Sequence, residues 1–344
     1  MRSIMDYNPN DIGIPNGNYF AFPYTVEESE IVLLSVPWDA TTSYGKGTAS
    51  GPEAIINAST QVDLYDFDVK DAWKIKTGTI PIEKAILTKN KVFGKYSDDI
   101  ISLLEKGISV EDKNVSSLLE KVNKASDEIN QWVYNESLDW LNKGKIVGVI
   151  GGEHSVPYGL IKALCSKHES FGILHIDAHA DLRNAYEGFT HSHASIMFNS
   201  MKFKNITKLV QVAVRDVCED EIEFANNDDR VIMYHDFQIK QDTYKGVLWD
   251  KQCDEIMTYL PENVYISFDI DGLTPEHCPN TGTPVPGGLR FYEAVYLIKK
   301  LSDYKKRIIG FDLCEVSPGD TEWDANVGAR ILQKLINYTH LCNE

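Results

Sequence analysis

Short apolar runs alternate with longer amphipathic stretches along most of the chain. The apolar runs, rich in Val, Ile, Leu and Phe, predict strands at Ile31–Val36, Lys145–Ile150, Phe171–Ile176, Leu209–Val214, Val231–Tyr234, Val264–Phe268 and Ile308–Leu313. The stretches between them have apolar positions at helical spacing and predict helices at Pro52–Ala58, Val156–Lys167, Glu219–Ala225, Tyr244–Tyr259, Phe291–Leu301 and Asn326–Tyr338. Repeated strand–helix order is typical of an α/β fold with one parallel sheet. Strands that are apolar throughout indicate that helices cover both faces of this sheet.

The segment Thr88–Lys143 interrupts this alternation. It is charged and its apolar residues recur at helical spacing without an intervening strand-like run. We interpret it as a helical insertion or excursion within a single domain that spans residues 1–344, because no repeat or low-complexity linker marks a boundary. Three roles remain open for it: a cover over the functional site, a contact between subunits, or a surface decoration.

Composition excludes several classes of protein. The chain has 344 residues, of which 43% are hydrophobic and 25% charged, and its net charge is −17. An acidic chain lacks the basic surface that sequence-independent nucleic-acid binding requires. It also lacks an apolar run of about 18 residues, so no membrane span is expected. The N-terminus has no apolar signal core and the six cysteines form no Cys-x-x-Cys pair, which favours a cytoplasmic protein with reduced thiols.

Acidic motifs follow two of the predicted strands. Asp-x-His-x-Asp at residues 177–181 comes directly after Phe171–Ile176, and Asp-x-Asp at residues 269–271 comes after Val264–Phe268. Ligands of parallel α/β sheets bind at the carboxyl ends of the strands, and alternate residues of an extended chain point to the same side. Four carboxylates and one imidazole would therefore converge and repel one another unless cations lie between them. This pattern predicts a two-metal site.

A third motif adds a histidine to this site. In Gly-Gly-Glu-His-Ser at residues 151–155, the glycines permit a tight turn after a predicted strand, which leaves His154 at the strand end. Oxygen donors with one imidazole per metal suit Mn²⁺, with Ni²⁺, Co²⁺ and Zn²⁺ as alternatives. The complete set of candidate ligands is His154, Asp177, His179, Asp181, Asp269 and Asp271.

These motifs occur in the order found in the ureohydrolase (arginase/agmatinase) family, which the chain resembles. Two further segments, Gly282–Leu289 and Glu315-Val316-Ser317-Pro318, match the same family. The resemblance extends from Val36 to the C-terminus, apart from Thr88–Lys143. It implies a three-layer α/β/α sandwich around an eight-stranded, mostly parallel sheet, assembled as a homotrimer or homohexamer.

The resemblance also implies a role for each site residue. One Mn²⁺ would be held by a set that contains His154 and Asp181, the other by a set that contains His179 and Asp271, with Asp177 and Asp269 shared between them. A hydroxide that bridges the two ions would attack the carbon of a guanidino group. The remaining roles are a hydrogen bond from the nucleophile to Asp181, a bidentate grip on the guanidinium by Glu315, and proton transfer to the leaving amine by His193.

Agmatine is the first expected substrate, with urea and putrescine as products. Arginases carry an Asn where this chain has Arg183, and an Asp that reads the substrate amino group where it has Cys218. Glu187 is a candidate to bind an amine tail, whereas Arg183 would suit the carboxylate of a guanidino acid or form a structural ion pair. Hydrolysis of 4-guanidinobutyrate, guanidine, formimidoylglutamate or arginine therefore remains an alternative.

Two readings from other classes are less well supported. Metal-dependent deacetylases use a single zinc ion and usually an adjacent pair of histidines, and this chain contains no His-His pair. A non-catalytic polyamine- or guanidine-binding protein descended from an enzyme would be expected to have lost metal ligands. All six candidate ligands are present here, together with His193 and Glu315.

Overall fold

An eight-stranded parallel sheet forms the centre of the molecule. The computed structural model describes residues 7–344. The order across the sheet is β2-β1-β3-β8-β7-β4-β5-β6, and every pair of neighbours is parallel. The strands are β1 (Ile31–Val36), β2 (Thr77–Ile80), β3 (Ile146–Gly151), β4 (Phe171–Ile176), β5 (Ile206–Val214), β6 (Val231–His235), β7 (Asn263–Asp269) and β8 (Arg307–Cys314).

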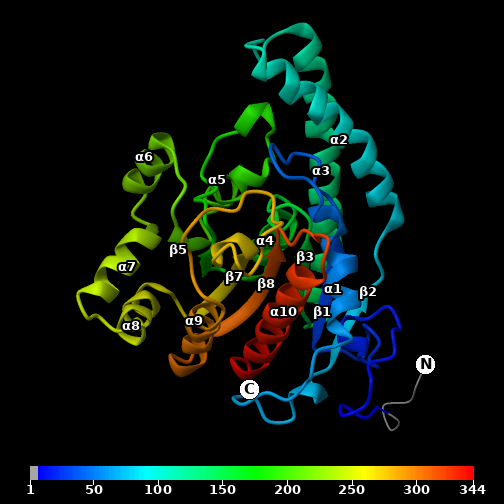
Figure 1. Cartoon of the computed structure of the whole chain (residues 1–344), viewed down its shortest axis with the longest axis vertical. Helices are drawn as coiled ribbons and strands as arrows, with labels where there is room; N and C mark the ends of the chain where they lie inside the picture. Colours follow the sequence, from blue (N-terminus) through cyan, green and yellow to red (C-terminus); the bar gives the residue numbers. More distant parts are fainter. Residues whose placement is uncertain (1–6) are drawn as a thin grey trace.

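Helices cover both faces of this sheet and confirm the predicted three-layer α/β/α architecture (Figure 1). Buried side chains of α1, α8, α9 and α10 form the apolar core on one face, and those of α3, α4 and α5 form the core on the other. The helices are α1 (Gly51–Ser59), α2 (Lys84–Glu105), α3 (Lys113–Asn142), α4 (Tyr158–Lys167), α5 (Ile196–Ser200), α6 (Glu219–Asn227), α7 (Asp236–Tyr244), α8 (Trp249–Tyr259), α9 (Phe291–Asp303) and α10 (Trp323–Leu341). None of the helices in residues 7–344 is both long and apolar enough to span a membrane.

The register of the central strands brings the acidic motifs to one edge. Ile176 at the end of β4 pairs with Phe268 of β7, which in turn pairs with Leu313 of β8. Because these strands are parallel and end together, Asp177 and Asp269 emerge side by side at the carboxyl edge of the sheet. The fold therefore places the predicted ligands where ligands of parallel sheets bind.

Helices α2 and α3 form an antiparallel hairpin over most of Thr88–Lys143, as Figure 1 shows at the top of the molecule. From Ala125 onward, α3 packs on the sheet through Ala125, Ile129 and Val133, which belong to the main core. The outer part of the hairpin encloses a separate apolar cluster, in which the buried side chains are Ile100, Val115, Leu119, Val122 and Phe189.

Four elements differ from the sequence-based expectation, and two of them, the short helices α5 and α7, were not predicted. The edge strand β2, Thr-Gly-Thr-Ile, was not predicted, because its four residues lack an apolar run. The stretch Tyr244–Tyr259 is not continuous: α7 ends at Tyr244, and α8 begins at Trp249. Gly246 between them has a φ of 92°, a left-handed conformation that ends a helix and favours glycine.

Candidate active site

Three of the predicted ligands surround the imidazole of a fourth, His154. Its Nδ1 atom lies 3.0 Å from Asp177 Oδ2, 3.0 Å from Asp181 Oδ2 and 3.4 Å from Asp269 Oδ2. His154 follows β3, the two aspartates of the first motif follow β4, and Asp269 is the last residue of β7. Side chains from three strands thus meet at one point, as the sequence predicts.

The remaining two ligands form a second group that shares Asp177 with the first. His179 Nδ1 lies 3.1 Å from Asp271 Oδ2 and 3.4 Å from Asp177 Oδ1. The backbone holds this group in place: Ala178 N–H donates to Asp271 Oδ1 at 3.0 Å, and Asp271 N–H donates to Asp269 Oδ1 at 2.9 Å. All six predicted ligands therefore lie in two adjoining groups, linked by Asp177 and Asp269.

The electrostatics of these buried carboxylates suit divalent cations. Burial and the charges of Asp271 and Asp177 raise the pKa of Asp269, and burial and the charge of Asp177 raise the pKa of Asp181 to about 6. Burial alone would also raise the pKa of Asp177. The charge of His175 and hydrogen bonds from neighbouring histidines outweigh the effect of burial, so the pKa of Asp177 is lowered. Carboxylate and imidazole donors at this density fit two divalent ions, which would relieve the repulsion between the acids.

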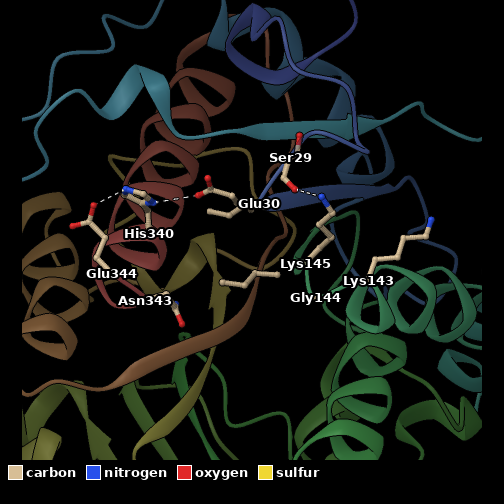
Figure 2. A pocket seen from close by; sticks show the side chains of 10 residues that line it. Ser29, Glu30, Lys143, Gly144, Lys145, His340, Asn343 and Glu344 are labelled. Carbon is tan, nitrogen blue, oxygen red and sulfur yellow. Dashed lines mark hydrogen bonds and ion pairs between the residues drawn. The ribbon is translucent and has the colours of Figure 1, made fainter.

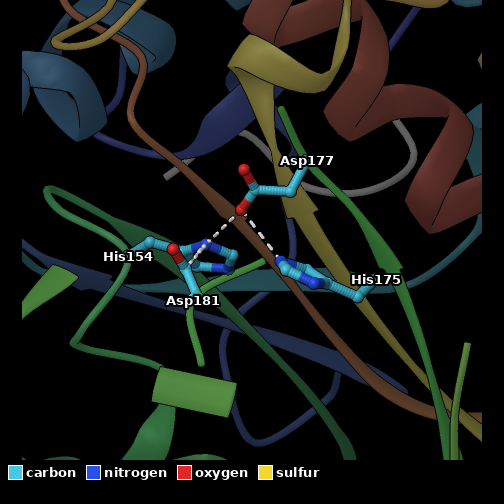
Figure 3. Close-up of side chains that lie close together, drawn as sticks. All are labelled: His154, His175, Asp177 and Asp181. Carbon is cyan, nitrogen blue, oxygen red and sulfur yellow. Dashed lines mark hydrogen bonds and ion pairs between the residues drawn. The ribbon is translucent and has the colours of Figure 1, made fainter. Parts of the chain in front are cut away.

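His175 supports the site and was not predicted. Its Nε2–H donates to Asp177 Oδ2 at 2.8 Å, so the Asp177 carboxylate lies between the His154 and His175 rings, as Figure 3 shows. The Gln211 amide nitrogen donates to His175 Nδ1 at 2.9 Å and to Ala180 O at 2.7 Å, which fixes the tautomer of His175. Such outer partners orient metal-ligating carboxylates. The sequence signal that could have identified His175 is its place within an otherwise apolar strand-like run.

A second supporting group, also not predicted, lies behind His154. Asp312 of β8 is completely buried and accepts hydrogen bonds from Tyr265 Oη at 2.6 Å and Ser267 Oγ at 2.8 Å. Ser267 Oγ in turn lies 2.9 Å from His154 Nε2. The Nε2 atom thus carries the proton, and Nδ1 is left to face the carboxylates as a ligand atom.

Glu315 has one carboxylate oxygen without a partner. Its Oε1 accepts the His154 backbone N–H at 2.9 Å, whereas the buried Oε2 has no hydrogen-bond partner among the described residues. Burial and the charge of Glu153 raise the pKa of Glu315. Its φ of 62° and the 56° of Asp181 are left-handed, and strain of this kind concentrates at functional sites. A cationic group with N–H donors would satisfy Oε2.

His193 lies beside the metal ligands in a neutral form. Its Nδ1 is 3.1 Å from Thr41 O, its backbone N–H donates to Thr41 Oγ1 at 3.3 Å, and its Nε2 is 3.5 Å from Ser43 Oγ. Burial and the charge of His179 lower the pKa of His193 to about 4. Because Nδ1–H donates to the Thr41 carbonyl, Nε2 is the atom that can accept or release a proton in the site.

The residues predicted to read the substrate tail lie on the loop after β4. Arg183 Nε is 3.5 Å from Glu221 Oε2, and the guanidinium carbon lies 4.6 Å from the centre of the Tyr186 ring. Glu187 is half-buried, and burial and the charge of Glu105 raise its pKa. Tyr186 stands edge-on to the His193 ring, with 6.2 Å between ring centres, and was not predicted as a site residue.

A pocket at the opposite, amino edge of the sheet contains none of the predicted residues (Figure 2). His340 lies between Glu30, 3.5 Å from its Nδ1, and Glu344, 3.0 Å from its Nε2. Lys145 donates to the carbonyl oxygens of Glu27 and Ser29. His340 is thus paired with two carboxylates and Lys145 with backbone carbonyls, and none of the candidate ligands lines this pocket.

A comparison with family models identifies the family of this chain. The model described as "Arginase family" matches residues 29–337, which include every candidate ligand together with His193 and Glu315. The chain belongs to the arginase family. Members of this family use a binuclear metal centre, and this chain has clustered His and Asp side chains that could hold metal ions. One cluster contains His154, His175, Asp177 and Asp181, and the other contains Asp177, His179 and Asp271.

Curated relatives place this arginase-family chain among agmatinase-like ureohydrolases. It is 30% identical over 298 residues to an N(1)-aminopropylagmatine ureohydrolase of Thermus thermophilus, covering 86% of this chain and 85% of that protein. It is 28% identical to the protein of the same name from Synechocystis, covering 85% and 82%. It is 26% identical to the agmatinase of Bacillus subtilis, covering 90% and 92%. The chain is thus an enzyme, a hydrolase of the ureohydrolase type.

Solved structures share its fold. The agmatine ureohydrolase of Thermoplasma volcanium superposes with a TM-score of 0.72 at 23% identity and covers 95% of this chain and 96% of that one. The proclavaminate amidino hydrolase of Streptomyces clavuligerus gives a TM-score of 0.72 at 21% identity and covers 97% and 100%. At these identities the likeness establishes the α/β fold.

Proposed function

We propose that this protein is a binuclear manganese amidinohydrolase that cleaves agmatine to urea and putrescine. The observation that carries the proposal is the buried Glu315 Oε2 atom, which lacks a partner among the described residues and adjoins the six ligands. A guanidinium group is planar, cationic and rich in N–H donors, so it would satisfy this oxygen and match the carboxylate geometry. Membership of the arginase family supports the same chemistry.

The residues of the chain would divide the reaction between them. When bound, the two ions would lower the pKa of a water molecule and so make hydroxide available at neutral pH. Asp181 would accept a hydrogen bond from the attacking water. Glu315 would bind the N–H groups of the guanidinium and so hold its carbon in line with that water. Water adds to that carbon and gives up a proton, which the unprotonated His193 Nε2 would accept. As the bond to the amine nitrogen breaks, His193 Nε2 would pass this proton to the leaving amine.

A longer polyamine is the second candidate substrate. The name N(1)-aminopropylagmatine ureohydrolase is carried by relatives that are 28% and 30% identical to this chain. Glu187, on the loop that adjoins His193, would bind an ammonium group of either tail. Arg183 is near Glu221 and stacks on Tyr186, which supports a structural role for it over recognition of a substrate carboxylate. Guanidino acids are therefore less well supported.

A parallel substrate assay tests this proposal. Protein reconstituted with Mn²⁺ is incubated with agmatine, N(1)-aminopropylagmatine, 4-guanidinobutyrate, arginine, formimidoylglutamate and guanidine, and urea, formamide and ammonia are measured. The proposal predicts urea and putrescine from agmatine. Preference for N(1)-aminopropylagmatine would retain the chemistry and change the substrate. Preference for 4-guanidinobutyrate would make Arg183 the tail-binding residue and overturn the assignment to an amine substrate.

A further inference from the structure

Helix α2 holds the loop that follows β1. Asp39 N–H donates to Asn90 Oδ1 at 2.8 Å, and Asn90 Nδ2 donates to Asp39 Oδ1 at 2.7 Å; both side chains are buried. The other oxygen of Asp39 accepts the backbone N–H groups of Gly47 and Ala49 at 3.0 and 3.1 Å. One reciprocal pair of hydrogen bonds therefore links α2 to both ends of the loop that carries Thr41 and Ser43.

Helix α3 holds the loop that follows β4 in a comparable way. Asn123 Nδ2 donates to Gly188 O at 3.0 Å, and Asn123 Oδ1 accepts the Thr190 N–H at 2.9 Å. The residue between these two positions, Phe189, is completely buried and packs within the apolar cluster of the hairpin. Gly188 has a φ of 85°, so this backbone shape tolerates few other residues. A side-chain amide and a buried ring thus fix three consecutive residues of the loop.

The two loops meet at His193. Thr41, on the first loop, contacts the His193 backbone N–H and ring Nδ1 at 3.3 and 3.1 Å. On the second loop, His191 Nε2 lies 3.1 Å from Asp127 Oδ1, one helical turn beyond Asn123 on α3. Both loops that enclose the proton-transferring histidine are therefore anchored to one hairpin, which contributes no predicted metal ligand.

We propose that the α2–α3 hairpin is a positioning element for His193 and for the tail-binding part of the loop, and that Asn123 is its principal positioning residue. The importance of this placement for turnover rests on the function proposed above. The placement itself does not, because Asn123 acts through Gly188 and Thr190 whether or not substrate is present. Removal of the Asn123 side-chain amide would release residues 188–190 from α3 and leave the candidate metal ligands unchanged.

The variant Asn123→Ala tests the proposal, with Asn135→Ala as the matched control. Asn135 lies on the same helix, is exposed, and bonds only to the Gln131 side chain among the described residues. Metal content, melting temperature, hydrogen–deuterium exchange of residues 186–195 without substrate, and kcat and KM for agmatine are measured. For Asn123→Ala we expect unchanged metal content, faster exchange in residues 186–195, and a kcat/KM lower by roughly ten- to a hundredfold. The control should match the parent in all four.

A second variant separates positioning from general stability. In Asn123→Asp, one oxygen can still accept the Thr190 N–H, but the donor to Gly188 O is lost, so an intermediate effect on exchange and on kcat/KM is expected. Unchanged exchange in Asn123→Ala would overturn the proposal, as would faster exchange with unchanged kcat/KM or an equal loss of protection throughout the chain. If the parent protein cleaves no guanidino compound, the proposed function fails, and the exchange data alone decide whether Asn123 holds the loop.

Discussion

Buried polar side chains, each tied to another element, define this site at the scale of single residues. Asp177 contacts His154 and His175, and Asp271 accepts the Ala178 backbone N–H. Glu315 has a left-handed backbone, and its Oε2 has no hydrogen-bond partner among the described residues. Because each carboxylate has its geometry set by neighbours in the fold, the cluster is organised before a ligand binds. Such preorganisation is the main protein contribution to metal-assisted hydrolysis.

The shared carboxylate Asp269 provides one prediction. Asp269→Asn removes a charge from the centre of the cluster with almost no change in shape, so at least one Mn²⁺ should be lost, together with nearly all turnover. Metal content by mass spectrometry and urea release from agmatine measure both effects. Retained activity in this variant would show that the reaction does not use this site.

Removal of the His193 imidazole should separate chemistry from metal binding. In His193→Ala both ions should remain bound, because His193 is not a predicted ligand, while kcat should fall by about 10²- to 10⁴-fold through loss of proton transfer to the amine. Steady-state kinetics and metal analysis of the same preparation test this. An unchanged kcat would assign the proton transfer to another group.

Metal affinity should fall as the pH is lowered. In the metal-free protein, burial and the charge of Asp177 raise the pKa of Asp181 to about 6. Burial lowers the pKa of His179, but the neighbouring acids, Asp271 first, outweigh burial and raise the pKa of His179 to about 12. Cations bind the deprotonated forms, so binding must displace these protons and should weaken further below pH 6, where Asp181 is also protonated. Competition titrations with Mn²⁺ at about pH 5.5 and 7.5 measure the change. Equal affinities would argue against both residues as ligands.

The convergence of the six candidate ligands was predictable from sequence, but the residues that orient them were not. Asp-x-His-x-Asp and Asp-x-Asp are unusual motifs that follow strand-like runs, so their chemistry and their place are both visible. His175, Ser267 and Asp312 instead lie within strands, and their sequence positions do not reveal which neighbouring strand they face. That information depends on the strand order β3-β8-β7-β4, which one sequence alone does not specify.

At the scale of elements, secondary structure was predicted correctly where apolar runs are long, and it was missed in short or polar segments. Strands β4 and β7 are buried over nearly their full length, and their apolar runs identified them. The edge strand β2 pairs with only β1, and although three of its four residues are buried, they are Thr and Gly and form no apolar run. The segment Thr88–Lys143 has a helical pattern, and the contacts of Asn90 and Asn123 suggest a role that this pattern does not reveal.

The inner half of α3 should contribute directly to the stability of the main core. Ile129 is 3% exposed and packs on the face of the sheet that α4 covers, so Ile129→Ala should lower the free energy of unfolding by about 2–5 kcal/mol. Val110→Ala, in the exposed link between α2 and α3, should have little effect. Urea denaturation of both variants tests this. Equal stabilities would indicate that α3 is only loosely attached to the sheet.

At the scale of the whole molecule, the site depends on long-range order. Its candidate ligands come from residues 154 to 271, the residue proposed to bind the guanidinium is Glu315, and the hairpin of residues 84–142 contacts the loops around it. The long-range character follows from the parallel sheet, which brings strand ends from distant parts of the chain to one edge. A single fold thus brings the candidate ligands, Glu315 and the loops around them to one edge of the sheet.

The most direct test of the central claim is urea release from agmatine, measured as Mn²⁺ is titrated into metal-free protein. We predict that activity is absent without metal, rises as ions bind, and saturates at two Mn²⁺ per subunit. Binding of two ions without cleavage of any guanidino compound, or full activity in metal-free protein, would contradict the assignment of a binuclear amidinohydrolase.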